Sequence, residues 1–231
     1  MNIHILYEDN HLLIVEKPNN LPVQQDQSND PDLLTILKED IKIRYNKPGN
    51  VYLALVHRLD RPVGGAIVFA KTSKAASRMA NLLRKREMNR SYLAIVRGTV
   101  AQNNGTLIHY LWKDNQKNIV HAVKKGTRGA KKAILHYEVL DRKDNMSFLH
   151  VTLETGRSHQ IRVQLSEIGH PLFGDQKYGK DVNKIGEQIA LWSHTLSFIH
   201  PVRKTEITVE SYPEKNYPWN KWIANESFKQ S

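Results

Sequence analysis

The sequence of 231 residues contains no cysteine. This absence excludes disulfide bonds, thiol nucleophiles and cysteine-ligated zinc, and it is compatible with a reducing compartment. Long apolar runs are missing too, because no stretch approaches the length needed to span a membrane. The N-terminal segment MNIHILYEDNHLLIVEKP is interrupted by four charged residues, so it does not resemble a signal peptide. We therefore expect a cytoplasmic protein with no membrane partner.

Several motifs that carry cofactor or hydrolase chemistry are also absent. The chain has no GxGxxG, GxxxxGK(S/T), HExxH or GxSxG sequence, so the usual cradles for dinucleotides and triphosphates and two common hydrolase sites are missing. Eleven histidines are present, but those in strand-like segments, at 109, 121, 136 and 150, lack the spacing of metal ligands. We expect neither a cofactor nor a required metal.

Positive charge is what the sequence has in excess. Lys and Arg number 34 against 23 Asp and Glu, which gives a net charge of +11. Such a surface favours anionic partners, and nucleic acid is the first candidate. The segment 123–132, VKKGTRGAKK, carries five cations and two glycines and is expected to be a phosphate-contacting loop.

Hydrophobic periodicity predicts an α+β fold. With 40% hydrophobic residues the chain can bury one sizeable core, so we expect a single domain over residues 1–231, working as a monomer. Segments rich in β-branched and aromatic residues predict a mixed, mainly antiparallel sheet with packed helices. The expected strands lie in 4–17 (two strands), 51–57, 64–72, 91–98, 109–114, 118–125, 131–141, 146–156, 189–200 and 204–212.

Three segments have helical spacing instead. Apolar residues line one face in 28–46 and again in 73–88, and Ser73 can cap the second helix. A third helix is expected to start at Ser158 and to stop near Gly169.

Asp60 is the residue that most needs an explanation. It lies in VHRLDRPVGGAIVFAK, between two expected strands, with Arg58 and Arg61 on either side. Asp before Arg-Pro is ordinary turn chemistry, and that interpretation suffices if Asp60 is taken alone. A carboxylate that acts as a nucleophile, however, must be ionised and aimed, and a nearby guanidinium favours both.

A second segment, ETGRSHQIRVQ at 154–164, offers such a guanidinium in Arg157. Its bland interpretation is an N-cap and a solvated first helical turn. Glu154 and Asp175 are further acids, and together with Asp60 they would also suit a metal-dependent nuclease with a basic groove.

With these segments in view the chain resembles the RNA pseudouridine synthases, in the family that modifies uridines of large-subunit ribosomal RNA and of some tRNAs. HRLD at 57–60 is similar to the family's central motif. Four further blocks follow the family order: LYEDNHLLIVEKPNNLPV, REMNRSYLAIVRG, TGRSHQIRVQL, and HPLFGDQKYG with ALWSHTLSFIHP. The resemblance implies the pseudouridine synthase fold with a central active-site cleft. It also implies an isomerase that acts on a flipped-out uridine of structured rRNA or tRNA, without a cofactor.

The resemblance also implies roles for single residues. Asp60 matches the catalytic aspartate, Tyr92 the active-site tyrosine and Arg157 the arginine that pairs with the aspartate. Arg58 matches the loop arginine that fills the space left by the extruded nucleotide. Tyr92 taken alone would be a core aromatic, and Arg58 a solvated phosphate contact. The expected substrate-binding set is Arg58, Arg61, His57, Gln160 and Leu191.

Some features depart from the family pattern. After HRLD the family usually has Ser or Thr followed by Ser-Gly, whereas this chain has Arg61-Pro62-Val63-Gly64-Gly65; Arg90 stands where Lys is common. The N-terminal part before the first block is too short for the small S4-like RNA-binding domain that several members carry. A non-catalytic RNA-binding assembly factor therefore remains an alternative, and Asp60 could act on C1′ and its sugar or on C6 of the base.

Overall fold

The computed structural model describes residues 3–223, which form two compact units. Unit 1 comprises Met1–Arg90 and Ser193–Tyr212, and unit 2 comprises Ser91–Trp192 and Pro213–Ser231. The chain passes from one unit to the other within strand β5 (Met88–Arg97) and again within β10 (Leu191–Ile199). Residues 1–2 and 224–231 of the single domain expected over 1–231 lie outside the described residues.

The sheet of unit 1 is built on β2, whose apolar residues alternate between two covered faces. Its strands follow the order β1-β2-β4-β10, with β3 paired to β4 and β11 paired to β10. The pairings β1–β2, β2–β4, β3–β4 and β10–β11 are antiparallel. Besides β10 the strands are β1 (Ile5–Glu8), β2 (Leu12–Lys17), β3 (Ala54–Leu55), β4 (Gly64–Ala70) and β11 (Glu206–Glu210).

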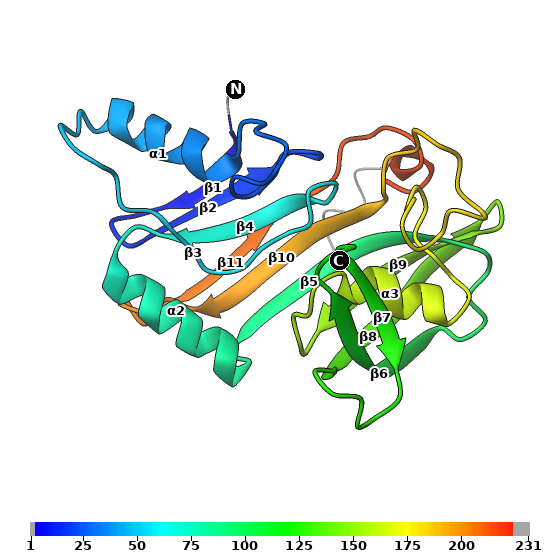
Figure 1. Ribbon diagram of the computed structural model, residues 1–231. Coiled ribbons are helices and arrows are strands. Elements are labelled where there is room, and N and C mark those ends of the chain that lie inside the picture. The colour runs from blue at the N-terminus through cyan, green and yellow to red at the C-terminus, as the bar shows by residue number, and fades with distance from the viewer. Residues whose placement is uncertain (1–2, 224–231) are drawn as a thin grey trace. The chain divides into compact units, whose positions relative to one another are not determined.

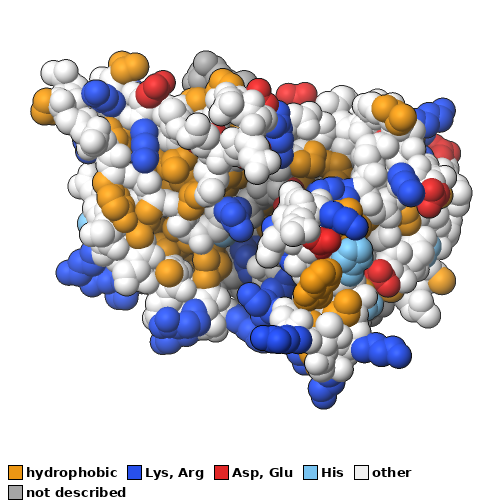
Figure 2. Space-filling view, viewed as in Figure 1, with side chains coloured by type: hydrophobic (Ala, Val, Ile, Leu, Met, Phe, Trp, Pro, Cys, Tyr) orange, Lys and Arg blue, Asp and Glu red, His pale blue; other side chains and the backbone are white. Residues whose placement is uncertain are grey.

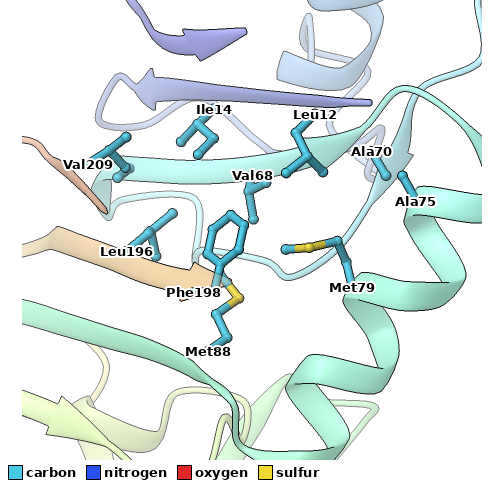
Figure 3. Close-up of a cluster of buried hydrophobic side chains, with 11 residues drawn as sticks. Leu12, Ile14, Val68, Ala70, Ala75, Met79, Met88, Leu196, Phe198 and Val209 are labelled. Carbon is cyan, nitrogen blue, oxygen red and sulfur yellow. The ribbon is translucent and has the colours of Figure 1, made fainter. Parts of the chain in front are cut away.

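Two helices cover unit 1. Helix α1 (Leu33–Arg44) starts where the Asp32 carboxylate accepts the N–H of Thr35, and it buries Leu33, Leu37 and Ile41. Helix α2 (Ser73–Lys85) lies on the other side of the strands (Figure 1). It points Ala75 and Met79 at the face of β2 that carries Leu12 and Ile14, and this core continues to Phe198 of β10 (Figure 3).

The strands of unit 2 follow the order β5-β9-β8-β6-β7, and their pairings are antiparallel. Its strands besides β5 are β6 (Asn104–Asp114), β7 (Ile119–Val123), β8 (Lys131–Lys143) and β9 (Met146–Leu153). Helix α3 (Gln160–Glu167) packs on one face of β6, β7 and β8 through a cluster made of Leu111, Val120, Ala133 and Val163. A 3-10 turn, η1 (Trp219–Lys221), follows the last strand, and Trp219 meets Phe148 of β9 edge to face.

The α+β class with a mainly antiparallel sheet and packed helices is thus confirmed, whereas three local expectations are wrong. The strand expected over 51–57 shrinks to Ala54–Leu55. The cap of α2 is Thr72, whose hydroxyl accepts the N–H of Ala75, and Ser73 is only the first helical residue. Helix α3 starts at Gln160 rather than Ser158, because His159 at its N-cap adopts a left-handed conformation with φ 51°.

No helix within residues 3–223 is both long enough and apolar enough to span a lipid bilayer. That the two units serve one catalytic domain stays a prediction.

Gly65 of β4 provides a test of the unit 1 packing. It has φ +109°, and a Cβ there would overlap the backbone of Ser193 in β10. We expect Gly65→Ala to lower the free energy of unfolding by several kcal/mol, since it combines an unfavourable φ with a backbone clash. Gly49→Ala is the matched control, because nothing lies within 4 Å of a Cβ at Gly49. Urea denaturation measures both, and equal stabilities of the two variants would contradict the close approach of β4 and β10.

Candidate active site

The loop that carries Asp60 joins β3 to β4 in unit 1. Asp60 is partly exposed, and its backbone carbonyl accepts the N–H of Val63 at 3.0 Å, which closes a tight turn over Arg61 and Pro62. The turn thus holds its shape through a backbone hydrogen bond at the place where the family usually has hydroxyl residues. Gly64 then begins β4.

Lys17, the last residue of β2, holds this turn through hydrogen bonds to backbone carbonyls. Its side chain is fully buried, and Nζ donates to the carbonyl oxygens of Pro18 (2.9 Å), Leu21 (2.7 Å) and Arg61 (2.9 Å). Burial lowers the pKa of Lys17 to about 7, and the negative charge of Asp60 opposes that shift. Sequence reasoning missed Lys17, because it follows four apolar residues and Glu16 at the end of β2, where a charged residue is ordinary.

His57 supports the same loop from within the core. It is buried, and its Nε2 accepts the N–H of Val68 in β4 at 3.3 Å. Strand β3 ends at Leu55, so the imidazole supplies an acceptor to β4 beyond the end of its partner strand. Burial lowers the pKa of His57 to about 3, with a smaller contribution from the charge of Arg90, so the ring is neutral at physiological pH.

The two arginines beside Asp60 differ in their surroundings. Arg58 is exposed. The guanidinium of Arg61 bridges to the preceding loop, where it donates to the carbonyl of Asn20 (3.1 Å), to Ser28 (3.0 Å) and to the carboxylate of Asp30. Arg61 therefore fastens the segment that leads into α1 to the Asp60 turn.

In unit 2, Arg157 lies between β9 and α3, and Gln160 holds its backbone. The buried Gln160 accepts the N–H of Arg157 (3.0 Å) and the hydroxyl of Thr155 (2.8 Å), and it donates to the carbonyl of Ile134 (3.0 Å). Thr155 in turn accepts the N–H of Ile134 at 2.8 Å. The exposed Arg157 side chain donates through Nε to the carbonyl of Lys132 at 3.1 Å.

The acids of the nuclease interpretation are occupied by other groups. Asp175 is fully buried and accepts both Nε and Nη2 of Arg162 at 2.8 Å, and these bonds hold the pKa of the carboxyl below its usual range against the effect of burial. Glu154 is 2.7 Å from Nε2 of His136. Among the residues that the structure describes, no three acidic or histidine side chains gather in a way that would hold a metal ion.

The remaining predicted residues, Tyr92 and Leu191, lie on strands of unit 2. Tyr92 of β5 is 5% exposed and pairs with Val151 of β9, and Leu191 at the start of β10 is 4% exposed. The structure thus brings His57, Arg58, Asp60 and Arg61 together in unit 1. In unit 2 it brings Arg157 and Gln160 together through a hydrogen bond.

Comparisons with known proteins show which family the chain belongs to. The family model described as RNA pseudouridylate synthase matches residues 11–167. The RNA pseudouridine synthase YhcT of Bacillus subtilis is 34% identical over 212 residues, which cover 90% of this chain and 68% of YhcT. Ribosomal large subunit pseudouridine synthase C of Buchnera aphidicola is 31% identical over 215 residues, covering 90% of this chain and 66% of the relative.

A solved structure shows the same fold. Human RNA pseudouridylate synthase domain containing 4 superposes with a TM-score of 0.76 at 23% sequence identity, over 92% of this chain and 89% of the human one. With the family model matched over more than half of the sequence, the chain belongs to the RNA pseudouridine synthase family, whose members are isomerases acting on RNA.

Proposed function

We propose that this chain converts uridine to pseudouridine in a structured RNA, with Asp60 as the catalytic residue and with both units serving one catalytic domain. The observation that carries the proposal is the construction of the Asp60 turn. The fully buried Lys17 donates a hydrogen bond to the backbone of this turn, and the guanidinium of Arg61 is hydrogen-bonded to Ser28 beside it. Asp60 itself stays partly exposed. A loop made for a turn alone would not need a buried lysine with three carbonyl partners.

The reaction needs only what side chains supply. The N1–C1′ bond breaks and a C5–C1′ bond forms, C5 loses its proton and N1 gains one, so no electrons and no added group are required. Asp60 acts either at C1′ and its sugar or at C6 of the ring, and Arg157 aims its carboxylate. Tyr92 holds the ring and Leu191 packs beneath it.

The target nucleotide must leave its stack before it reacts, at a cost of a few kcal/mol. Arg58, which is exposed beside Asp60, is suited to occupy the vacated space. His57 and Gln160, expected as direct substrate contacts, are buried and hydrogen-bonded to the backbone. We therefore assign them to positioning the Asp60 turn and Arg157, and Arg61 to fixing the loop that borders the site.

The substrate is expected to be ribosomal RNA or tRNA. Relatives named for the ribosomal large subunit, such as pseudouridine synthase C of Buchnera, favour ribosomal RNA and with it a cytoplasmic place of action. The proposed enzyme works as a monomer and needs no metal.

Asp60→Asn tests the central assignment. It keeps the shape of the side chain but removes the carboxylate, so we expect turnover to fall by roughly 10³-fold or more, with little change in stability. Release of tritium from RNA labelled at uridine C5 measures turnover directly, because the new C5–C1′ bond expels that hydrogen. Asp40→Asn, at an exposed ion pair of α1, is the control. A folded Asp60→Asn protein with undiminished release would remove Asp60 from the mechanism, and a wild-type protein without release would favour the assembly factor.

Gln160→Met tests the positioning of Arg157. Methionine matches the length of glutamine but removes the acceptor of the Arg157 N–H and of the Thr155 hydroxyl. The carbonyl of Ile134 loses one donor and keeps the N–H of Glu154 at 3.2 Å. We expect a loss of about 1–3 kcal/mol in the free energy of unfolding. Turnover should fall on the order of tenfold to a hundredfold, since Arg157 loses its orientation. Gln176→Met removes one exposed hydrogen bond and is the control. A stability loss with unchanged turnover would limit Gln160 to a structural role.

Lys17 gives a pH-dependent test. Its folded-state pKa of about 7 lies below the ordinary value of 10.5, so between these values the unfolded chain binds the proton more tightly than the folded chain. Stability should therefore rise with pH across this window in the wild type relative to Lys17→Met. Urea denaturation of both proteins near pH 7 and near pH 9.5 measures the difference, in which other titrating groups cancel. A difference independent of pH would mean that the three carbonyls keep the ammonium charged throughout.

A further inference from the structure

Unit 2 carries an aromatic sheet face that the proposed chemistry does not use. In β6 the side chains of Leu111 and its alternate neighbours point toward α3, while Ile108, Tyr110 and Trp112 point away from it. Trp112 is 37% exposed and Ile108 54%. Large apolar side chains that are exposed together on one face often mark a binding surface.

The aromatic side chains on this face are arranged in register. Trp112 of β6 and His121 of β7 are direct cross-strand partners, with ring centroids 6.1 Å apart and ring planes inclined by only 28°. Tyr110, two residues along β6, pairs with Val123 on one side and with Lys132 of β8 on the other. The result is a flat aromatic surface bordered by a cation.

The 124–132 loop, which comprises the β7–β8 connection and the first two residues of β8, adds charge to this surface. It contains no acid, and its five cations make no ion pair with a described residue. These cations are Lys124, Lys125 and Arg128 in the connection and Lys131 and Lys132 at the start of β8. A Cβ on Gly129 would lie 3.6 Å from Cδ1 of Trp112, so the loop backbone passes beside the indole. Figure 2 shows Lys and Arg side chains around the β6–β7–β8 part of unit 2, with hydrophobic and histidine side chains between them.

The same strands lead to Arg157. Its Nε donates to the carbonyl of Lys132, whose cross-strand partner is Tyr110. Arg157 is therefore hydrogen-bonded to strand β8, which pairs directly with the strand that carries Tyr110 and Trp112.

We propose that Trp112 and His121, with Tyr110 beside them, form a stacking platform for unpaired bases that flank the target uridine, while the 124–132 loop contacts their phosphates. Exposed aromatics on a sheet face, flanked by cations, suit single-stranded RNA because every base has a π-face and every link a negative charge. The inference rests on the proposed function only in taking RNA as the ligand.

A ten-residue oligoadenylate labelled with a fluorophore tests the platform in the full-length protein. It contains no uridine, so it does not report on the uracil site. We expect Trp112→Ala to raise the dissociation constant, measured by fluorescence anisotropy, roughly fivefold to a hundredfold, and Trp112→Phe to retain most of the affinity. Ile185→Ala, which changes a 97% exposed residue outside strands β6 to β8, is the control and should bind as the wild type does.

The outcomes separate this inference from the proposed function. Asp60→Asn should bind oligoadenylate normally, so loss of binding in Trp112→Ala with no turnover in the wild type would preserve the platform and overturn the isomerase. Unchanged oligoadenylate binding by Trp112→Ala would overturn the platform. A loss of binding that occurs only when Lys124, Lys125 and Arg128 are changed to Gln would overturn it as well. If Trp112→Ala lowers the thermal stability of the protein, His121→Ala is used instead, because His121 is exposed. The expected loss of oligoadenylate affinity is then smaller.

Discussion

The buried ammonium of Lys17 is the constraint on which the Asp60 turn depends. Three carbonyl oxygens from two separate stretches of chain converge on Nζ, and together they match the three hydrogens of an ammonium group. Taking such a cation out of water is costly unless it is fully hydrogen-bonded. In return, the hydrogen bonds of Lys17 fix the backbone next to the proposed catalytic acid, Asp60.

The same solution recurs around Arg157 with neutral groups. Gln160 takes part in a small network of hydrogen bonds with Arg157, Thr155 and Ile134. This network fixes the backbone of Arg157 to strand β8. In both units a buried polar side chain at the end of a regular element holds the loop that carries the reactive group. The exposed residues can then meet RNA without setting their own geometry.

Periodicity was enough to predict most strands and all three helices, because alternation and helical spacing are properties of local sequence. The two errors at helix starts have different reasons, since the cap of α2 is a choice between two adjacent hydroxyl residues, whereas the start of α3 involves a distant residue. Thr72 rather than Ser73 caps α2 through the backbone of Ala75, and α3 begins late because His159 turns left-handed. The Nδ1 of His159 lies 2.5 Å from the hydroxyl of Tyr178, a partner that spacing does not reveal.

The candidate site shows the same limit. Asp60, Tyr92, Arg157 and Gln160 are predicted from their match to the family motifs, but nothing local distinguishes Lys17 from a surface lysine or shows that the side chain of Gln160 is buried. The sequence predicts a strand over 109–114 that contains Trp112, but only the position of α3 on one face decides which side chains of β6 stay exposed. An isomerisation without a cofactor must draw its rate acceleration from interactions with the bound RNA, and unstacking a nucleotide costs a few kcal/mol. Stacking of the neighbouring bases on the aromatic face offsets this cost when the target uridine is flipped out. The exposed side chains of β6 would therefore contribute to the choice of RNA substrate.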